Sequence, residues 1–137
     1  MKKARKSENV TVNRRAHYDY HLGDELTVGM VLAGLEVRAI RDHHVQLKGS
    51  FITLKNRELW LNNLTLGADN VQNIKLLATK KQIATLARAR QDGLQIVPVR
   101  LLAGGRYIKL VIATGKSKKK YDKREAIKKR DINRGKF

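Results

Sequence analysis

The stretch SFITLKNRELWLN, residues 50–62, predicts an antiparallel β-hairpin. Its two halves are rich in aromatic, β-branched and aliphatic residues, and the polar segment Lys55-Asn56-Arg57 between them suits a turn. Upstream, residues 18–22 alternate in character and residues 26–32 are almost wholly apolar, which indicates a further strand. The centre of the chain is therefore predicted to consist mainly of strands.

A second hairpin is predicted downstream. Residues 94–102 and 106–113 flank the turn Ala103-Gly104-Gly105. Pro98 lies inside the first of these two strands. Because proline has no amide hydrogen to donate, we expect this strand to lie at a sheet edge or to contain a bulge at Pro98.

Two helices are predicted between the strands. Residues 34–41 suit a short helix, because Val37 and Ile40 are three residues apart. The same spacing separates Arg38 from Arg41, so this helix has an apolar side and a basic side.

The second helix has clearer signals at its two ends. Thr79 and Gln82 fit a capping box, in which the threonine hydroxyl accepts a hydrogen bond from the Gln82 amide. Gly93 is placed to end the helix in a left-handed conformation. The predicted buried stripe consists of Ile83, Leu86 and Ala87. Basic residues surround this stripe, and for Arg88 and Arg90 we favour an ordinary solvated helix face.

Several short strands around isolated helices indicate a small closed barrel, for which the oligonucleotide-binding fold is one candidate. Composition divides the chain into a basic N-terminal arm (1–12), a barrel domain (13–115) and a basic C-terminal tail (116–137). The tail has almost no apolar face. We therefore expect it to be disordered in the free protein and to order only against a charged partner.

The protein carries a formal net charge of +18 over 137 residues. Residues 1–15 hold a net +5 and residues 116–137 a net +8, so most of the excess lies in two terminal segments. A charge of this size favours a polyanionic partner, and nucleic acid provides one through counterion release. An anionic membrane surface is disfavoured, because the tail offers few apolar anchors: Ala126, Ile127 and Ile132.

The sequence offers no pattern typical of an enzyme. Cysteine is absent, and the pair His43-His44 has no carboxylate or histidine at helical spacing to complete a metal site. The adjacent carboxylates Asp24 and Glu25 face no predicted pocket. We therefore expect a protein that is not an enzyme and that uses neither a metal nor a cofactor. We also expect a cytoplasmic location, since the sequence has no cysteine, no visible signal peptide and no apolar run long enough to span a membrane.

The aromatic residues lie close to basic ones. Tyr18 and Tyr20 follow Arg14 and Arg15, and Tyr121 lies within a lysine-rich segment. An aromatic ring in such a setting can stack on an unpaired base while its neighbours bind phosphates. For Tyr18 and Tyr20, burial in the first strand is an equally good interpretation.

Five motifs, in sequence order, resemble those of one protein family. They are Asn13-Arg14-Arg15-Ala16 ahead of Tyr18-Asp19-Tyr20, then Gly29-Met30-Val31-Leu32-Ala33-Gly34-Leu35-Glu36-Val37, Lys75-Leu76-Leu77, Val97-Pro98 and Tyr121-Asp122-Lys123-Arg124-Glu125. The chain is similar over about residues 13–130 to small protein B, the family of SsrA-binding proteins of bacterial trans-translation. It departs from the family at Thr27, where glutamate is usual.

The resemblance implies a mainly β fold: a closed antiparallel barrel of the oligonucleotide-binding type with two to three attached α-helices and a basic C-terminal tail. It also implies a function. The barrel is expected to bind the tRNA-like domain of transfer-messenger RNA, and the pair to enter a stalled ribosome as a tRNA would. The tail is expected to lie in the empty mRNA channel of the small subunit, near the decoding region, and to fold there as a helix. We expect a monomer with no membrane partner.

The resemblance and the residue chemistry together define two sets of candidate residues. The expected contacts to transfer-messenger RNA are Asn13, Arg14, Arg15, Tyr20, Glu36, Lys75, Leu77 and Lys80. The expected ribosome-binding residues of the tail are Lys118, Lys119, Lys120, Tyr121, Asp122, Lys123, Arg124, Lys128, Lys129 and Arg130.

Some of these residues have a specific expected role. Arg14 and Arg15 are expected to contact phosphates, and Asn13 to position their segment by hydrogen bonds to the backbone. Leu77 is expected to support the RNA surface by packing. In the tail, the expected roles are phosphate binding by Lys123 and Arg124, base stacking by Tyr121 and helix capping by Asp122.

Two other functions remain open at this point. A general ribosomal or translation-factor RNA binder of the same barrel class would share the charge and the fold, and its selectivity for RNA would distinguish it. An enzyme that acts on nucleic acid would need a cluster of carboxylates for metal ions, and the sequence provides none.

Overall fold

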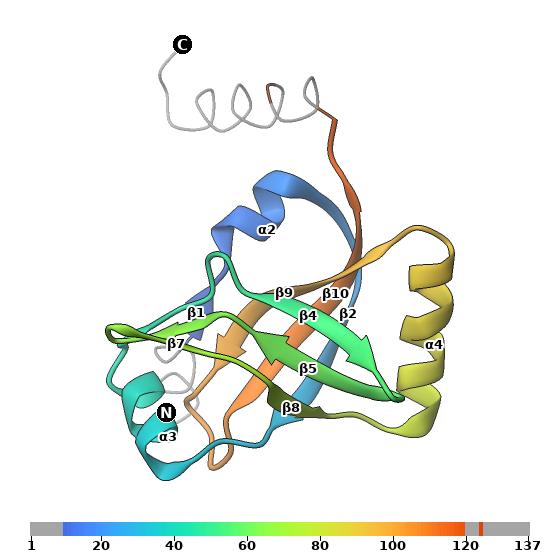
Figure 1. The fold of residues 1–137 in the computed structure, drawn as a ribbon. Coiled ribbons are helices and arrows are strands. Elements are labelled where there is room, and N and C mark those ends of the chain that lie inside the picture. The colour runs from blue at the N-terminus through green and yellow to red at the C-terminus, as the bar shows by residue number, and fades with distance from the viewer. Residues whose placement is uncertain (1–9, 120–123, 125–137) are drawn as a thin grey trace, which may run out of the picture.

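A computed structural model describes residues 10–119 and residue 124 (Figure 1). The elements in chain order are β1 (Val10–Val12), α2 (Arg14–Asp19), β2 (Tyr20–Met30), α3 (Gly34–Arg41), β3 (Val45–Gln46), β4 (Phe51–Lys55), β5 (Glu58–Asn62), β6 (Leu64–Leu66), β7 (Asp69–Val71), β8 (Ile74–Leu77), α4 (Lys80–Gln91), β9 (Gln95–Leu102) and β10 (Lys109–Ser117). The expectation of a mainly β domain with helices is confirmed in this part of the chain.

The strands form two antiparallel sheets. The larger has seven strands in the order β1-β9-β10-β2-β8-β5-β4, and the smaller has three in the order β3-β6-β7. The larger sheet bends strongly, so that β4 and β5 lie in front of β9 and β10 in Figure 1. Helix α4 covers one side of this bend, and α2 lies at its upper end in the same view.

The prediction of a closed barrel is wrong, because the edge strands β1 and β4 do not pair and both sheets are open. The physical reason lies on β9. Pro98 has no amide hydrogen to offer a neighbouring strand. The carbonyls of Pro98 and Val99 accept hydrogen bonds from Asn13, each at 2.8 Å, so they are not available to a strand that would close the sheet.

The elements with strong local signals are where the sequence predicted them. The first hairpin forms from β4 and β5 around Asn56 and Arg57, whose φ angles are +54° and +61°. Positive φ at both central residues is the geometry of a type I′ turn, which suits the twist of antiparallel strands. The second hairpin pairs β9 with β10, and the pairing shifts register beside Pro98, which confirms the predicted bulge.

Both predicted helices are confirmed. Helix α3 covers residues Gly34–Arg41. At the start of α4, the Gln82 amide donates to the Thr79 hydroxyl at 3.1 Å, and the Thr79 amide donates to the Gln82 side chain at 2.9 Å. Gly93 follows the helix with a φ of +89°, which is the expected left-handed ending.

Helix α2 was not predicted, since residues 18–22 suggested a strand. Only Ala16 is buried in this six-residue helix, so it has no apolar stripe of its own. Its position is fixed by long-range hydrogen bonds from Asn13 to β9. Such contacts leave no periodic pattern in the local sequence.

The core lies inside the bend of the larger sheet. Its central residues come from both sheets and from α3 and α4, and the largest fully buried ones include Ile40, Leu59, Leu61, Leu64, Leu101, Leu110 and Ile112. A second, smaller cluster of Val99, Val111 and Ala113 lies apart from it. None of the helices in the described residues is long and apolar enough to cross a membrane.

Candidate RNA interface

Asn13 holds the start of α2 against β9. Only 6% of its surface is exposed. Its backbone amide donates to the Val99 carbonyl and its side-chain amide donates to the Pro98 carbonyl, so the side chain does not cap the helix. The remaining polar atom, Oδ1, is buried without a hydrogen-bond partner among the described residues. Asn13 therefore fixes this segment and keeps one acceptor unused.

The two arginines after Asn13 lie on the surface. Arg15 forms an ion pair with Asp19 one turn later, at 3.1 Å, and its guanidinium lies 5.4 Å from the centroid of the Tyr18 ring. Tyr18 and Tyr20 are half-buried, so neither is a core residue. The segment thus presents cations beside partly exposed aromatic rings.

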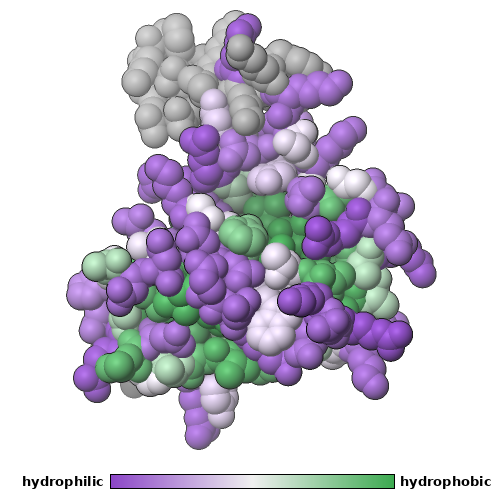
Figure 2. Space-filling view, viewed as in Figure 1, coloured by the Kyte–Doolittle hydropathy of each residue, from purple (hydrophilic) through white to green (hydrophobic). Residues whose placement is uncertain are grey.

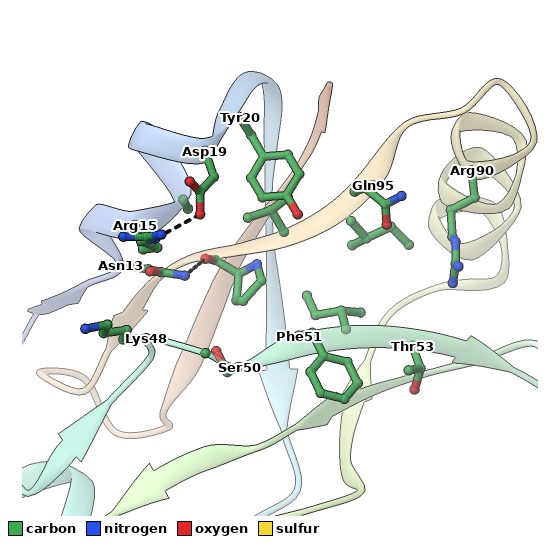
Figure 3. A pocket seen from close by; sticks show the side chains of 16 residues that line it. Asn13, Arg15, Asp19, Tyr20, Lys48, Ser50, Phe51, Thr53, Arg90 and Gln95 are labelled. Atoms are coloured by element: carbon green, nitrogen blue, oxygen red, sulfur yellow. Dashed lines mark hydrogen bonds and ion pairs between the residues drawn. The ribbon is translucent and has the colours of Figure 1, made fainter. Parts of the chain in front are cut away.

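Arg15, Asp19 and Tyr20 border a groove of about 650 Å³ between α2, β9 and the start of β4 (Figure 3). Its floor includes the buried apolar residues Ile52, Ile96 and Val97. Phe51 lies at the β4 side, and 50% of its surface is exposed. Cations reach the groove from three separate elements: Arg15, Lys48 and Arg90.

A second group of candidate residues lies elsewhere, on β8 and at the start of α4, at the lower end of the sheet in Figure 1. Lys75 and Leu77 line a depression of about 510 Å³ between β8, the β4–β5 turn and the start of α4. Lys75 pairs with Glu58 at 2.9 Å, and both side chains remain partly exposed. The structure therefore divides the body candidates between two places.

The packing role expected for Leu77 is wrong. Strand β8 alternates, so that Ile74 and Leu76 point into the core while Lys75 and Leu77 point outward. Leu77 is 53% exposed and lies over Gly29, where an added Cβ would come within 3.3 Å of the leucine side chain. Leu77 thus belongs to the outer surface.

Several cations around this depression are in positions that are unfavourable for the stability of the fold. Lys80 and Lys81 are exposed in the first turn of α4, where the helix dipole disfavours positive charge. Arg57 adopts a left-handed conformation that is strained for a residue with a side chain. The depression therefore carries exposed positive charge on two sides.

Glu36 has a structural role. Its carboxylate accepts a hydrogen bond from the Ala33 backbone amide at 2.7 Å, at the start of α3. A carboxylate satisfies a free amide at a helix N-terminus and interacts favourably with the helix dipole. Glu36 therefore stabilises the start of α3. It lines neither the groove beside α2 nor the depression around Lys75.

The start of the tail is held against α2. The Lys118 backbone amide donates to the Asp19 carbonyl at 2.8 Å, and its Nζ donates to the His17 carbonyl at 3.0 Å. Lys119 and Arg124 are exposed. The other tail candidates, and the expectation that the tail is disordered in the free protein, lie outside the described residues: Lys120, Tyr121, Asp122, Lys123, Lys128, Lys129 and Arg130.

One ion pair on the outer face has a resolved electrostatic effect. The Arg100 guanidinium donates to both oxygens of Glu25, at 2.7 and 2.9 Å. This hydrogen bonding lowers the pKa of Glu25 below its ordinary value and raises the pKa of Arg100. Within the described residues, no three histidine or acidic side chains lie close enough to hold a metal ion.

Sequence reasoning missed several residues of these two sites. Phe51 begins a strand in which Ile52 is the inward residue, so alternation alone could have placed Phe51 outside the core. Arg90 was taken for an ordinary helix surface, and only the fold brings it to the groove. Figure 2 shows that this face of the molecule is mainly hydrophilic, with apolar surface between the charged side chains.

Comparisons with known proteins place these features in a family. The family model described as SmpB protein matches residues 10–136. An SsrA-binding protein of Limosilactobacillus reuteri (strain DSM 20016) is 37% identical over 135 residues, which cover 91% of this chain and 86% of that protein. An SsrA-binding protein of Streptococcus pneumoniae (strain Hungary19A-6) is 38% identical over 135 residues, with coverage of 91% and 87%.

The fold agrees with these sequence relationships. A solved structure described as "tmRNA-SmpB: a journey to the center of the bacterial ribosome" superposes with a TM-score of 0.65 and 30% sequence identity. The match covers 87% of this chain and 94% of that chain. Since the family model spans nearly the whole sequence and the relatives share more than a third of its residues, the chain belongs to the SmpB protein family.

Proposed function

We propose that this protein binds the tRNA-like domain of transfer-messenger RNA and delivers that RNA to stalled ribosomes for trans-translation. The observation that carries the proposal is the family match across residues 10–136. The relatives are SsrA-binding proteins, and the similar solved structure concerns tmRNA, SmpB and the bacterial ribosome. The net charge of +18 supports a partner that is RNA.

The depression around Lys75, Leu77 and Lys80 is the proposed contact to transfer-messenger RNA. Its lining combines an exposed leucine with a cation from β8, Lys75, and one from the β4–β5 turn, Arg57. Lys80 is exposed at the start of α4, next to the lining residue Thr79. Lysine and arginine bind phosphates, and an exposed apolar side chain can contact a ribose or a base. Arg14 and Arg15 add a second basic surface beside α2.

The tail is the proposed contact to the ribosome. Residues 116–137 carry a net charge of +8, which suits the RNA walls of the mRNA channel. Lys123 and Arg124 are proposed to bind ribosomal phosphates, with Tyr121 stacking on a base near the decoding region. The protein is proposed to act in the cytoplasm as a monomer, by binding alone and without catalysing a reaction.

A truncation separates the two RNA contacts. Removal of the chain after Lys119 preserves β10 and the hydrogen bonds of Lys118, so the body should fold as before. We expect the shortened protein to bind transfer-messenger RNA within about threefold of the full chain, while tagging of stalled peptides in a reconstituted translation system is lost. If binding and tagging fall together, the tail is a general electrostatic arm and its proposed ribosomal role is wrong.

A further inference from the structure

We propose that the groove between α2, β9 and β4 receives a single unpaired base of the small-subunit ribosomal RNA, with Phe51 as its stacking surface. The inference rests on the proposed function, because it takes the ribosome as the second partner. It adds a base-binding site centred on Phe51, a residue that the sequence did not mark for RNA contact.

The shape of the groove suits one nucleotide. Its volume of about 650 Å³ lies within the range of about 300–1,000 Å³ that is typical of pockets for small ligands. Its apolar floor of buried residues can cover the face or edge of a base. A double helix is far too wide to enter, so an RNA ligand would enter the groove as an unpaired nucleotide.

The side chains around the groove match the parts of a nucleotide. Phe51 is half exposed, although a phenyl ring gains by leaving water, and bases of any sequence stack on such rings. The cations Lys48 and Arg90 lie on different sides of the groove, where they can bind the flanking phosphates. Tyr20 and Gln95, also in the lining, supply hydroxyl and amide groups for hydrogen bonds.

Asn13 provides an independent indication of a ligand. Its side chain lines the groove and is 94% buried, and its Oδ1 has no hydrogen-bond partner within the described part of the chain. A buried acceptor without a donor is costly, so native proteins rarely leave one unpaired. The exocyclic amino group of a base is a donor that a small movement of Asn13 would bring into reach.

The position of the tail identifies the source of the base. Asp19 lines the groove, and its carbonyl accepts the hydrogen bond from the Lys118 amide. The root of the tail therefore lies beside the groove. The elements that line the Lys75–Leu77 depression, β8 and the start of α4, lie at the lower end of the sheet in Figure 1. A tail directed into the mRNA channel places the groove against the RNA of the small subunit.

The first test compares variants at position 51. We expect Phe51→Ala to bind transfer-messenger RNA within about twofold of the parent and to lower tagging about tenfold or more, the loss that one stacked base predicts. Phe51→Trp keeps a stacking ring and should keep tagging. Tyr107→Ala is the matched control, because Tyr107 is an exposed aromatic residue outside the groove and its removal should change neither result.

The second test identifies the ligand directly and does not depend on the behaviour of a truncated side chain. A photocrosslinking phenylalanine analogue is placed at position 51 and, as a control, at position 107. We expect position 51 to crosslink to one unpaired nucleotide of the small-subunit RNA, only when ribosomes are present. A crosslink to transfer-messenger RNA or to a ribosomal protein would overturn the proposal, as would full tagging by Phe51→Ala.

These results are distinct from a failure of the proposed function. If the unmodified protein does not bind transfer-messenger RNA at all, the function is wrong whatever position 51 does. If it binds and tags normally but the groove variants have no effect, only the base-binding site is wrong.

Discussion

Leu76 and Leu77 are adjacent in the sequence but differ in solvent exposure. Leu76 is 2% exposed and lies in the core, whereas Leu77 is 53% exposed and faces outward beside Gly29. The same side chain therefore stabilises the fold at one position and is available to a ligand at the next. Residue type alone could not separate the two roles, because a strand of only four residues is too short to show which of its faces is buried.

This pair gives a matched prediction. We expect Leu76→Ala to lower the free energy of unfolding by about 2 to 5 kcal/mol, since it leaves a cavity in the core. Leu77→Ala should lower it by less than about 1 kcal/mol, because little buried surface is lost. In filter-binding assays the Leu77 variant should nevertheless bind transfer-messenger RNA more weakly. Urea unfolding measures the first two values, and a large stability loss at Leu77 would argue against its assignment to the surface.

Arg57 illustrates how function and stability conflict at a turn. The β4–β5 hairpin needs positive φ at position 57, where glycine is the favourable residue. We expect Arg57→Gly to raise the free energy of unfolding by about 1 kcal/mol, through relief of backbone strain. The same change removes a cation from the depression and should weaken binding of transfer-messenger RNA.

The control for this prediction is Lys55→Ala, which removes a nearby exposed cation without altering a strained φ angle. It should leave stability nearly unchanged. A stabilised Arg57→Gly variant that binds RNA as well as the parent would show that Arg57 has no part in the interface.

At the scale of the elements, the Glu25–Arg100 pair links β2 to β9 across the intervening strand β10. Because the folded state lowers the pKa of Glu25, the pair stabilises the protein above the ordinary pKa of 4.5 and is lost as the pH falls below it. Both side chains are partly exposed, so we expect less than about 1 kcal/mol. The difference in unfolding free energy between the parent and Glu25→Gln should be largest near pH 7 and should shrink toward pH 3. A difference that grows in acid would contradict this assignment.

The predictability of each element follows from where its determinants lie in the sequence. Helix α4 is specified by Thr79, Gln82 and Gly93, all within 15 residues, and the sequence placed it correctly. Helix α2 depends on the bond from Asn13 to Pro98, 85 residues away, and was missed. The strands β3, β6 and β7 have two or three residues each, too few for a periodic pattern.

The same long-range bond explains the error in the overall architecture. Short strands and helices correctly indicated a small β domain, but whether its sheet closes depends on how its edges meet. Asn13 occupies the carbonyls of β9 that a closing strand would need, and Pro98 offers no donor there. The groove lies between β4 and β9, where the sheet does not close. The closed-barrel prediction and the missed groove residues therefore have the same cause.

At the scale of the whole molecule, the two proposed RNA sites lie at opposite ends of the bent sheet. The Lys75–Leu77 depression lies at one end of the bent sheet, and α2, the groove and the root of the tail lie at the other. A carrier that holds one RNA while it contacts another needs this separation, since one polyanion must not displace the other. The body between them is held by a single main core, which keeps the two ends in a fixed relation.

The central claim is that the partner is transfer-messenger RNA, and the most direct test is to identify the RNA that the protein retains. The full chain is purified from a bacterial host under native conditions at moderate salt, and the bound RNA is sequenced beside that of a Lys75→Ala, Leu77→Ala, Lys80→Ala triple variant. The account predicts strong enrichment of transfer-messenger RNA over ribosomal and transfer RNA with the parent, and loss of that enrichment with the variant. RNA recovered in proportion to its cellular abundance, with no preference for transfer-messenger RNA, would contradict it.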